Sequence, residues 1–189
     1  MADRVRVVVI GGGAVGCSCL YHLCLLGWTD AVLLEQNELT SGSTWHAAGN
    51  APTFSTGWGV LKLQQYSAAL YRRLAADPDY PINYHVTGSV RLAHTDERMD
   101  EYRYVLGLAH ANGLDYELLT PAQLRERYPL VELEDLKGAL WDPEDGDIDP
   151  AQLTQAFAAA ARKLGARVQR FTKVTALAQR PTGEWHVTT

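Results

Sequence analysis

Two stretches near the start of the chain carry groups that could do chemistry. The first, GGGAVG at 11–16, matches the pattern G-x-G-x-x-G, and an acid, Glu35, follows about 20 residues further on. In this pattern the first glycine permits a tight turn, the second lets the backbone approach a pyrophosphate, and the third lets a helix pack closely on a strand. N–H groups at the start of that helix face the phosphates, helped by the positive end of the helix dipole. The predicted phosphate-binding residues are Gly11, Gly13, Ala14, Val15 and Gly16.

Glu35 indicates which nucleotide the glycine turn would hold. Its carboxylate is placed to accept hydrogen bonds from the ribose hydroxyls of an adenosine. No arginine adjoins Glu35 in the sequence, so a 2′-phosphate would be repelled, which disfavours NADP. The motif itself leaves NAD and FAD open.

The second stretch is the loop SGSTWHAAGN at 41–50, in which Trp45 and His46 stand side by side among small residues. Ser43 and Thr44 offer hydroxyl groups, while the glycines and alanines let the backbone lie close to a flat ligand. A loop of this composition is suited to a pyrophosphate and a ring system that it touches along its length. The lone imidazole could equally be a loop histidine that hydrogen-bonds to the backbone.

These residues need a βαβ unit to position them. Residues 4–10 are β-branched and nearly continuous, which predicts a buried parallel strand, and 14–26 and 31–35 predict the helix and strand that follow. The strands should be parallel and joined by a right-handed crossover.

The rest of the chain predicts two interleaved kinds of organisation. We expect a helix over 58–76 and a hairpin over 82–95 that breaks at Gly88. Further helices should begin after Thr95, Thr120 and Asp149, and strand-like segments follow from residue 167. The fold class is therefore α/β, with a doubly wound Rossmann-type binding domain over 1–80 and 150–189 and an inserted α+β segment over 81–149 that forms part of a substrate domain. The last strand has no turn or partner after it, so we expect the chain to be a fragment of a longer protein.

Composition and charge exclude several classes of function. The chain has 189 residues, 47% of them apolar, a net charge of −5 and a pI of about 5.6, so we expect no nucleic-acid partner. Its longest apolar runs are far below the ~20 residues of a membrane helix, and no targeting segment precedes the first strand, which predicts a cytoplasmic, bacterial protein. Cys17, Cys19 and Cys24 lack metal spacing and are expected to pack in a helix. The acidic string DPEDGD lacks the full ligand set of a calcium-binding loop, so we expect a turn there. We expect no metal site in the chain.

The segment VVVIGGGAVGCSCLYHLCLLGWTDAVLLEQNELTSGSTWHAAG resembles the N-terminus of the dimethylglycine and sarcosine dehydrogenase family, which has a D-amino-acid-oxidase-like flavoprotein fold. The resemblance continues through TGSVRLA, DPEDGDIDP and LTQAFAAAARKLGA, and STWHAAG is its most specific element. It implies that His46 is bonded covalently to the 8α-methyl carbon of FAD and that Trp45 covers one side of the flavin ring. The implied FAD contacts are Ala14 and Val15 at the phosphates, Glu35 and Gln36 at the ribose, the backbone of Val174 at the adenine, and Gly42, Ser43, Thr44, Trp45, His46, Ala47, Ala48, Gly49 and Asn50 along the flavin.

The resemblance also implies an activity, the oxidative demethylation of a small N-methylated amino acid such as dimethylglycine or sarcosine. Hydride passes to flavin N5, and oxygen or an electron-transfer flavoprotein then takes the electrons. Tetrahydrofolate would bind in a C-terminal domain outside these residues, and the catalytic residues of relatives lie beyond residue 189. Two alternatives stay open: a non-covalent amino-acid oxidase of the same fold, and a non-catalytic relative such as the pyruvate dehydrogenase phosphatase regulatory subunit. Many relatives have an aliphatic residue at Asn50 and a lysine at Gln36, so Asn50 leaves the substrate class open.

Overall fold

The computed structural model describes residues 4–53, 55, 57–80 and 82–189. They divide into two compact units, the first made of 1–49, 73–83 and 149–189 and the second of 50–72 and 84–148. The helix α2 (Trp58–Ala75) begins in the second unit, and its last three residues belong to the first. The sequence-based division instead assigned all of 1–80 to the binding domain. Residues 50–72 differ because β3 (Asn50–Ala51) pairs with a strand of the second unit.

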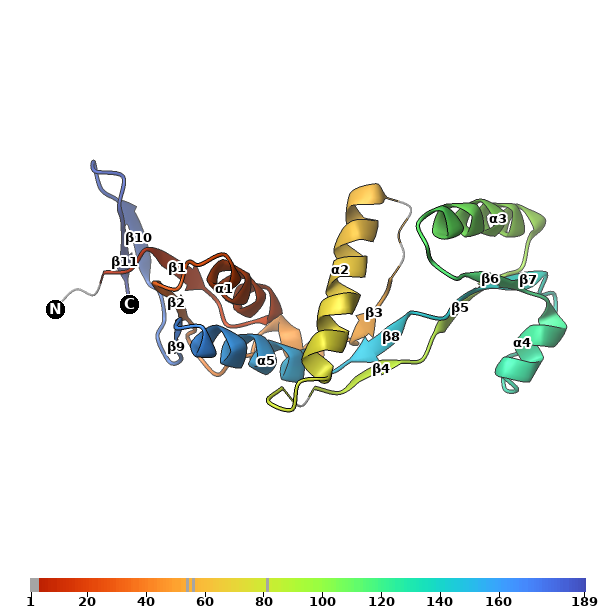
Figure 1. Cartoon of the computed structure of the whole chain (residues 1–189), viewed down its shortest axis with the longest axis horizontal. Coiled ribbons are helices and arrows are strands. Elements are labelled where there is room, and N and C mark those ends of the chain that lie inside the picture. The colour runs from red at the N-terminus through yellow and green to blue at the C-terminus, as the bar shows by residue number, and fades with distance from the viewer. Residues whose placement is uncertain (1–3, 54, 56, 81) are drawn as a thin grey trace. The chain divides into compact units, whose positions relative to one another are not determined.

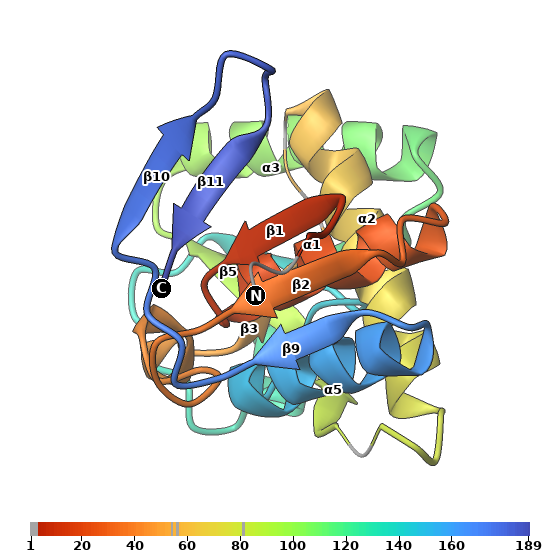
Figure 2. The same ribbon diagram turned by 90° about the vertical axis from the view of Figure 1, so that its left-hand side faces the viewer.

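The first unit is built on a three-stranded parallel sheet in the order β1-β2-β9 (Figure 2). Its strands are β1 (Val7–Ile10), β2 (Ala31–Leu34) and β9 (Arg167–Gln169). The middle strand β2 is buried along its whole length, which explains its continuous run of apolar residues. The predicted βαβ unit is therefore present, with β1 and β2 parallel and in register from Val7 opposite Ala31.

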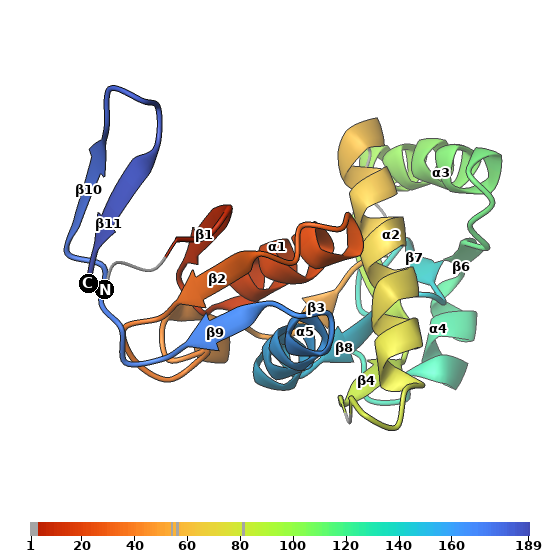
Figure 3. The ribbon, with the colours of Figure 1, turned by 60° about the vertical axis from the view of Figure 1, so that its left-hand side comes forward.

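Helices α1 (Ala14–Leu25) and α5 (Pro150–Lys163) cover one face of this sheet and pack on each other (Figure 3). Asp149 caps α5, since its side chain accepts hydrogen bonds from the N–H groups of Ala151 and Gln152. The packed side chains are small or apolar, and they include Cys17, Leu20, Leu33, Phe157 and Ala161. Cys17 and Cys24 are buried as expected, whereas Cys19 is exposed. A separate antiparallel hairpin, β10 (Ala176–Gln179) with β11 (Trp185–Thr188), ends the chain.

The second unit contains two antiparallel sheets. One has the order β5-β7-β6, with β5 (Ser89–Ala93), β6 (Glu117–Leu119) and β7 (Gly138–Asp142). Helices α3 (Asp96–Ala111) and α4 (Pro121–Arg127) lie on opposite sides of it (Figure 1). Successive residues of β7 point to opposite sides of the sheet. Leu140 packs in a hydrophobic cluster with residues of α3, and Ala139 packs in a second cluster with Leu124 of α4. The predicted caps at Thr95 and Thr120 are both present, the second as a full capping box with Gln123.

The other sheet of this unit corrects a prediction. Residues 82–95 were expected to form a hairpin, but β4 (Tyr84–Val86) and β5 do not pair with each other. Instead β4 pairs with β8 (Gly146–Ile148), which also pairs with β3, while β5 pairs with β7. Gly88 separates β4 and β5 for a packing reason, since a Cβ atom there would lie 2.0 Å from the ring of Trp141. Gly88 lies directly before β5, and its neighbour Trp141 lies in β7, the strand that pairs with β5. The local sequence pattern could not distinguish this close approach from a hairpin turn.

Candidate functional site

The glycine turn connects β1 to α1 as the sequence predicted. Gly13 is the N-cap of α1, and the N–H groups of its first turn have no partner within the helix. A Cβ atom at Gly16 would lie 1.9 Å from the carbonyl oxygen of Gly11, so only glycine lets α1 begin this close to the end of β1. The N–H of Ala14 donates to the side chain of Thr44, which leaves the N–H groups of Val15 and Gly16 in the first turn as the donors that could face a pyrophosphate.

Glu35 follows the last residue of β2 and lies against the turn. One carboxylate oxygen accepts a hydrogen bond from the N–H of Gly12 at 2.7 Å, and the other accepts from the N–H of Asn37 at 2.8 Å. Each oxygen keeps a further lone pair that could accept from a ribose hydroxyl. The next predicted residue, Gln36, is exposed.

The segment that holds Val174 runs beside Glu35. The N–H of Thr172 donates to the carbonyl oxygen of Glu35 at 2.8 Å, and the N–H of Phe171 donates to that of Asn37 at 3.4 Å. Val174 lies two residues further on, partly buried, before β10 begins. The structure thus brings together the turn, Glu35 and the chain around Val174, although they are far apart in sequence.

The loop after β2 folds back over the glycine turn. The N–H of Thr40 donates to the carbonyl oxygen of Gly12 at 3.0 Å, and the N–H of Ala14 donates to the hydroxyl oxygen of Thr44 at 3.0 Å. Residues Ser43–His46 form a short 3₁₀ turn, η1, that contacts α5. The predicted flavin contacts Gly42, Ser43, Trp45, His46, Ala47 and Ala48 are exposed, Thr44 is partly buried, and Gly49 is buried.

One predicted residue falls outside this group. Asn50 belongs to the second unit, where it pairs with Asp147 across β3 and β8. The other predicted contacts all belong to the first unit. The residues present fit a dinucleotide with an extended ring system.

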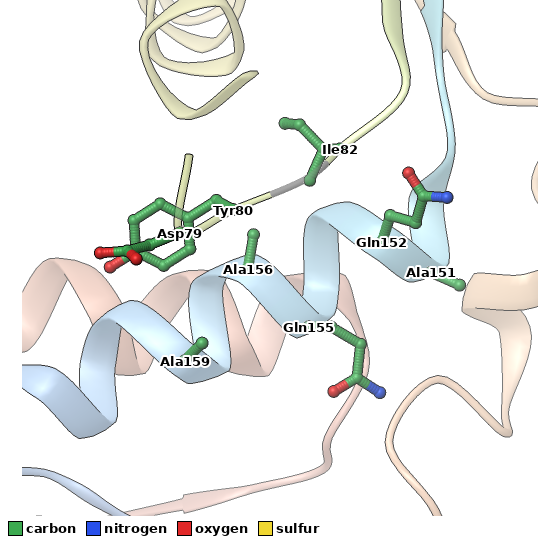
Figure 4. A pocket seen from close by; sticks show the side chains of 8 residues that line it. All are labelled: Asp79, Tyr80, Ile82, Ala151, Gln152, Gln155, Ala156 and Ala159. Atoms are coloured by element: carbon green, nitrogen blue, oxygen red, sulfur yellow. The ribbon is translucent and has the colours of Figure 1, made fainter. Parts of the chain in front are cut away.

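A cavity of about 380 Å³ also lies on the first unit, beside α5 (Figure 4). It is lined by Asp79, Tyr80, Ile82, Ala151, Gln152, Gln155, Ala156 and Ala159. None of the residues predicted to bind FAD lines it. Among the described residues, no group of three or more His, Cys, Asp and Glu could hold a metal ion, and no helix is long and apolar enough to cross a membrane.

The second unit contains a buried polar cluster that the sequence did not reveal. Asp142 and Asp145 are both buried, and the prediction of a turn at DPEDGD gave no sign of this burial. Thr53 donates its N–H to Asp145 at 2.6 Å and its hydroxyl to Asp142 at 3.1 Å. Ser89 and Arg91 also donate to Asp145, at 2.6 and 3.2 Å. These partners are up to 92 residues away in sequence, which is why a local pattern gives no sign of them.

The two carboxyl groups of this cluster have opposite pKa shifts. Burial is the main cause that raises the pKa of Asp142 to about 6, although the Tyr116 hydroxyl donates to it. Burial also acts to raise the pKa of Asp145, but hydrogen bonds from Asp142, Ser89 and Thr53 and the charge of Arg91 outweigh it and hold that pKa below its ordinary value. As the pH rises, Asp142 is therefore the member of the pair that keeps its proton longer.

The parallel sheet and the glycine turn define a Rossmann-type α/β domain, and comparison with known proteins identifies the family. The model of the FAD dependent oxidoreductase family matches residues 6–189, so the chain belongs to that family. It is 42% identical to the mitochondrial dimethylglycine dehydrogenase of Rattus norvegicus over 99% of this chain and 22% of that protein. It is 38% identical to the mitochondrial sarcosine dehydrogenase of Homo sapiens over 94% of this chain and 19% of that protein. The L-proline dehydrogenase structure from P. horikoshii superposes with a TM-score of 0.87 at 25% identity, covering 96% of this chain and 48% of that one.

Family membership supports the fold class and FAD as the cofactor. The chain spans about a fifth of the length of the dehydrogenases that it matches.

Proposed function

We propose that this chain is the FAD-binding N-terminal part of an amine oxidoreductase that demethylates a small N-methylated amino acid of the dimethylglycine or sarcosine type. The observation that carries the proposal is the loop 41–50, which contains the family string with His46 and is hydrogen-bonded through Thr44 to the start of α1. The identity to dimethylglycine dehydrogenase along nearly the whole chain supports the same substrate class.

The residues of the first unit would hold FAD in three places. The first-turn N–H groups of α1 would bind the pyrophosphate, and Glu35 would accept hydrogen bonds from the ribose. The loop from Gly42 to Gly49 would line the flavin, with His46 bonded covalently to it. Bound FAD supplies the two-electron acceptor that takes a hydride from the N-methyl carbon.

Two further parts of this proposal concern the complete protein. Oxygen or an electron-transfer flavoprotein would take the electrons from the reduced cofactor. Tetrahydrofolate, bound outside these residues, would take the one-carbon unit, which is otherwise released as formaldehyde.

The test is to add dimethylglycine or sarcosine to the purified complete gene product without oxygen and to follow the yellow flavin absorbance. We expect rapid bleaching with one of these amines, and one formaldehyde for each amine oxidised. Bleaching by D-amino acids or glycine in place of N-methylated ones would replace the proposal with an ordinary amino-acid oxidase. A protein that contains no flavin would support the non-catalytic alternative.

Covalent attachment has its own test. After denaturation in acid, flavin should stay with the wild-type polypeptide and should be released completely by the His46→Ala variant. Flavin that leaves the wild-type protein in acid would overturn the attachment while leaving the demethylation proposal to be decided by bleaching.

A further inference from the structure

Three polar residues form a row across the sheet β3-β8-β4 of the second unit. Asn50 in β3 and His85 in β4 are each paired with Asp147 in β8, the middle strand. Side chains of directly paired residues point to the same face of a sheet, so these three lie side by side on one face. Ala51 and Ile148, the next residues along β3 and β8, belong to the other face and are buried. Asn50, His85 and Asp147 are all exposed, so the row is open to solutes.

His85 and Asp147 form a hydrogen-bonded pair within this row. Nδ1 of His85 lies 3.1 Å from Oδ1 of Asp147. A carboxylate only accepts hydrogen bonds, so Nδ1 carries the hydrogen, and in the neutral imidazole the lone pair is on Nε2. The two side chains are 61% and 53% exposed, so a small solute can reach Nε2. The pair therefore has the composition of a proton acceptor, an imidazole with a free lone pair beside a carboxylate that stabilises its charged form.

The backbone also fixes the position of His85. A Cβ atom at Gly146 would lie 2.1 Å from the carbonyl oxygen of His85, so only glycine lets β4 approach β8 this closely. Within the described part of the chain, the charged group that faces His85 is Asp147 of β8, while β3 contributes the neutral Asn50. The imidazole is thus held by its own strand and by one carboxylate.

The row begins where the predicted flavin-binding loop ends. Asn50 directly follows Gly49, the last residue of the first unit that would line the flavin. Neighbouring strands lie about 4.8 Å apart, so the row extends about 10 Å from the backbone of Asn50 to that of His85. The course of the chain therefore keeps His85 within a short distance of the end of this loop.

We propose that this row takes the proton from the substrate amine, with Nε2 of His85 as the proton acceptor and Asp147 as its positioning residue. The inference rests on the proposed oxidation of an N-methylated amino acid. It names the substrate form that the row recognises, a secondary or tertiary ammonium that carries an N–H proton. The positive charge of this ammonium is complementary to the carboxylate of Asp147.

The proton has to leave before the amine can be oxidised. The pKa of an alkyl ammonium in water is about 10.4, so such a substrate arrives protonated at neutral pH. A hydride leaves the N-methyl carbon only when the nitrogen lone pair is free to form the iminium. In the proposed step the N–H bond of the ammonium breaks, its electron pair stays on nitrogen, and the proton bonds to Nε2 of His85. The step needs no oxidant.

The experiment compares the complete flavin-loaded gene product with its His85→Gln variant between about pH 7 and about pH 10. The rate of flavin bleaching by dimethylglycine is measured without oxygen. Glutamine can still donate to Asp147 but cannot take up the proton. We expect bleaching to be slower by about 100-fold at about pH 7, the usual contribution of a general base, and by much less at about pH 10, where water removes the proton.

Two further variants show whether the effect belongs to the row. Asp147→Asn keeps an oxygen that accepts from Nδ1 but removes the charge that stabilises the imidazolium, so bleaching should slow by about tenfold at about pH 7 and recover at higher pH. His94→Gln is the matched control, since His94 is another exposed histidine of the second unit, between β5 and α3, and it should behave like the wild type. Bound flavin should be unchanged in all three variants, because none of these residues belongs to the predicted FAD contacts.

The outcomes separate this inference from the function on which it rests. A loss in His85→Gln that is equal at every pH would show a structural role and overturn the inference. Wild-type rates in His85→Gln, loss of its flavin, or the same change in His94→Gln would also overturn it, and the proposed function would stand. If no N-methylated amino acid bleaches the flavin of the wild-type protein, the proposed function fails and the inference fails with it.

Discussion

The carboxylate of Glu35 accepts a hydrogen bond from the N–H of Gly12 at 2.7 Å, so the acid at the end of β2 is fixed directly to the turn that begins α1. Its second oxygen accepts from the N–H of Asn37. The residue that would recognise the ribose therefore also holds the shape of the turn that would bind the phosphates.

Replacing Glu35 by glutamine should weaken FAD binding without unfolding the protein. A carboxamide has one acceptor oxygen, so one of the two backbone N–H groups loses its partner and faces an NH₂ group. Hydrogen bonds to charged groups are worth about 1.5–3 kcal/mol, so we expect the Kd for FAD to rise by roughly 10- to 100-fold. Fluorescence titration of the flavin-free protein measures this. Glu38→Gln is the matched control, since Glu38 forms an exposed ion pair with Arg170, and an equal effect there would contradict a specific role for Glu35.

Replacing Gly16 by alanine should disrupt the start of α1. The new methyl group would lie 1.9 Å from the Gly11 carbonyl oxygen, so the helix must move away from β1. We expect a loss of roughly 1–3 kcal/mol in the free energy of unfolding, measured by urea denaturation, together with loss of FAD binding. Gly107→Ala makes the same chemical change in α3, where no atom lies within 4 Å of the new methyl group. That control should gain about 0.5–1 kcal/mol, and destabilisation of both variants alike would contradict the steric explanation.

The Asp142–Asp145 pair should make stability depend on pH in a defined window. Burial raises the pKa of Asp142 from 3.8 to about 6, so between these values the folded chain keeps a proton that the unfolded chain releases. Raising the pH through this window should therefore lower the free energy of unfolding, by about 3 kcal/mol in total. The lowered pKa of Asp145 acts in the opposite sense and at lower pH, where stability is lost as the pH falls.

Urea denaturation from about pH 4 to about pH 7 of the wild type, Asp142→Asn and Asp145→Asn tests this assignment. Asparagine cannot ionise, so Asp142→Asn should abolish the dependence between pH 4 and pH 6. Asp145→Asn should cost about 3–5 kcal/mol at neutral pH, because Arg91 loses its buried partner. The reverse order of effects would show that Asp145 is the protonated member.

The three cysteines should react very differently with a thiol reagent. Cys17 is 0% exposed and burial raises its pKa to about 12, so it should stay unlabelled in the folded protein. Cys19 is exposed and should be labelled first. Peptide mapping after brief treatment with iodoacetamide measures this, with the unfolded protein as control. Labelling of Cys17 before Cys19 would contradict the predicted packing of α1.

The sequence predicted the elements whose causes are local. The G-x-G-x-x-G turn, the caps at Thr95 and Asp149 and the buried strand β2 depend on neighbours within a few residues, and all are present. The pairings of β4 and β5 were missed because strand partners are chosen by long-range packing, and both strands pair with segments much later in the chain. FAD contacts predicted from the family resemblance, such as Val174, stay predictions.

The burial of Asp142 and Asp145 in the second unit could not be predicted from the local sequence either. Asp142 and Asp145 stand in a string of turn-forming residues, and acids in such strings are usually solvated. Their burial depends on Thr53 and Ser89, which come from other parts of the second unit.

Two hydrogen bonds in the first unit join the residues that flank the segment 84–148. The N–H of Asp149 donates to the carbonyl oxygen of Asn83 at 3.0 Å, and the N–H of Asn83 donates to the side chain of Gln152 at 2.6 Å. The residues on either side of the segment 84–148 are thus fastened to each other within the first unit. A segment flanked in this way can change its length and composition without moving the strands of the first unit.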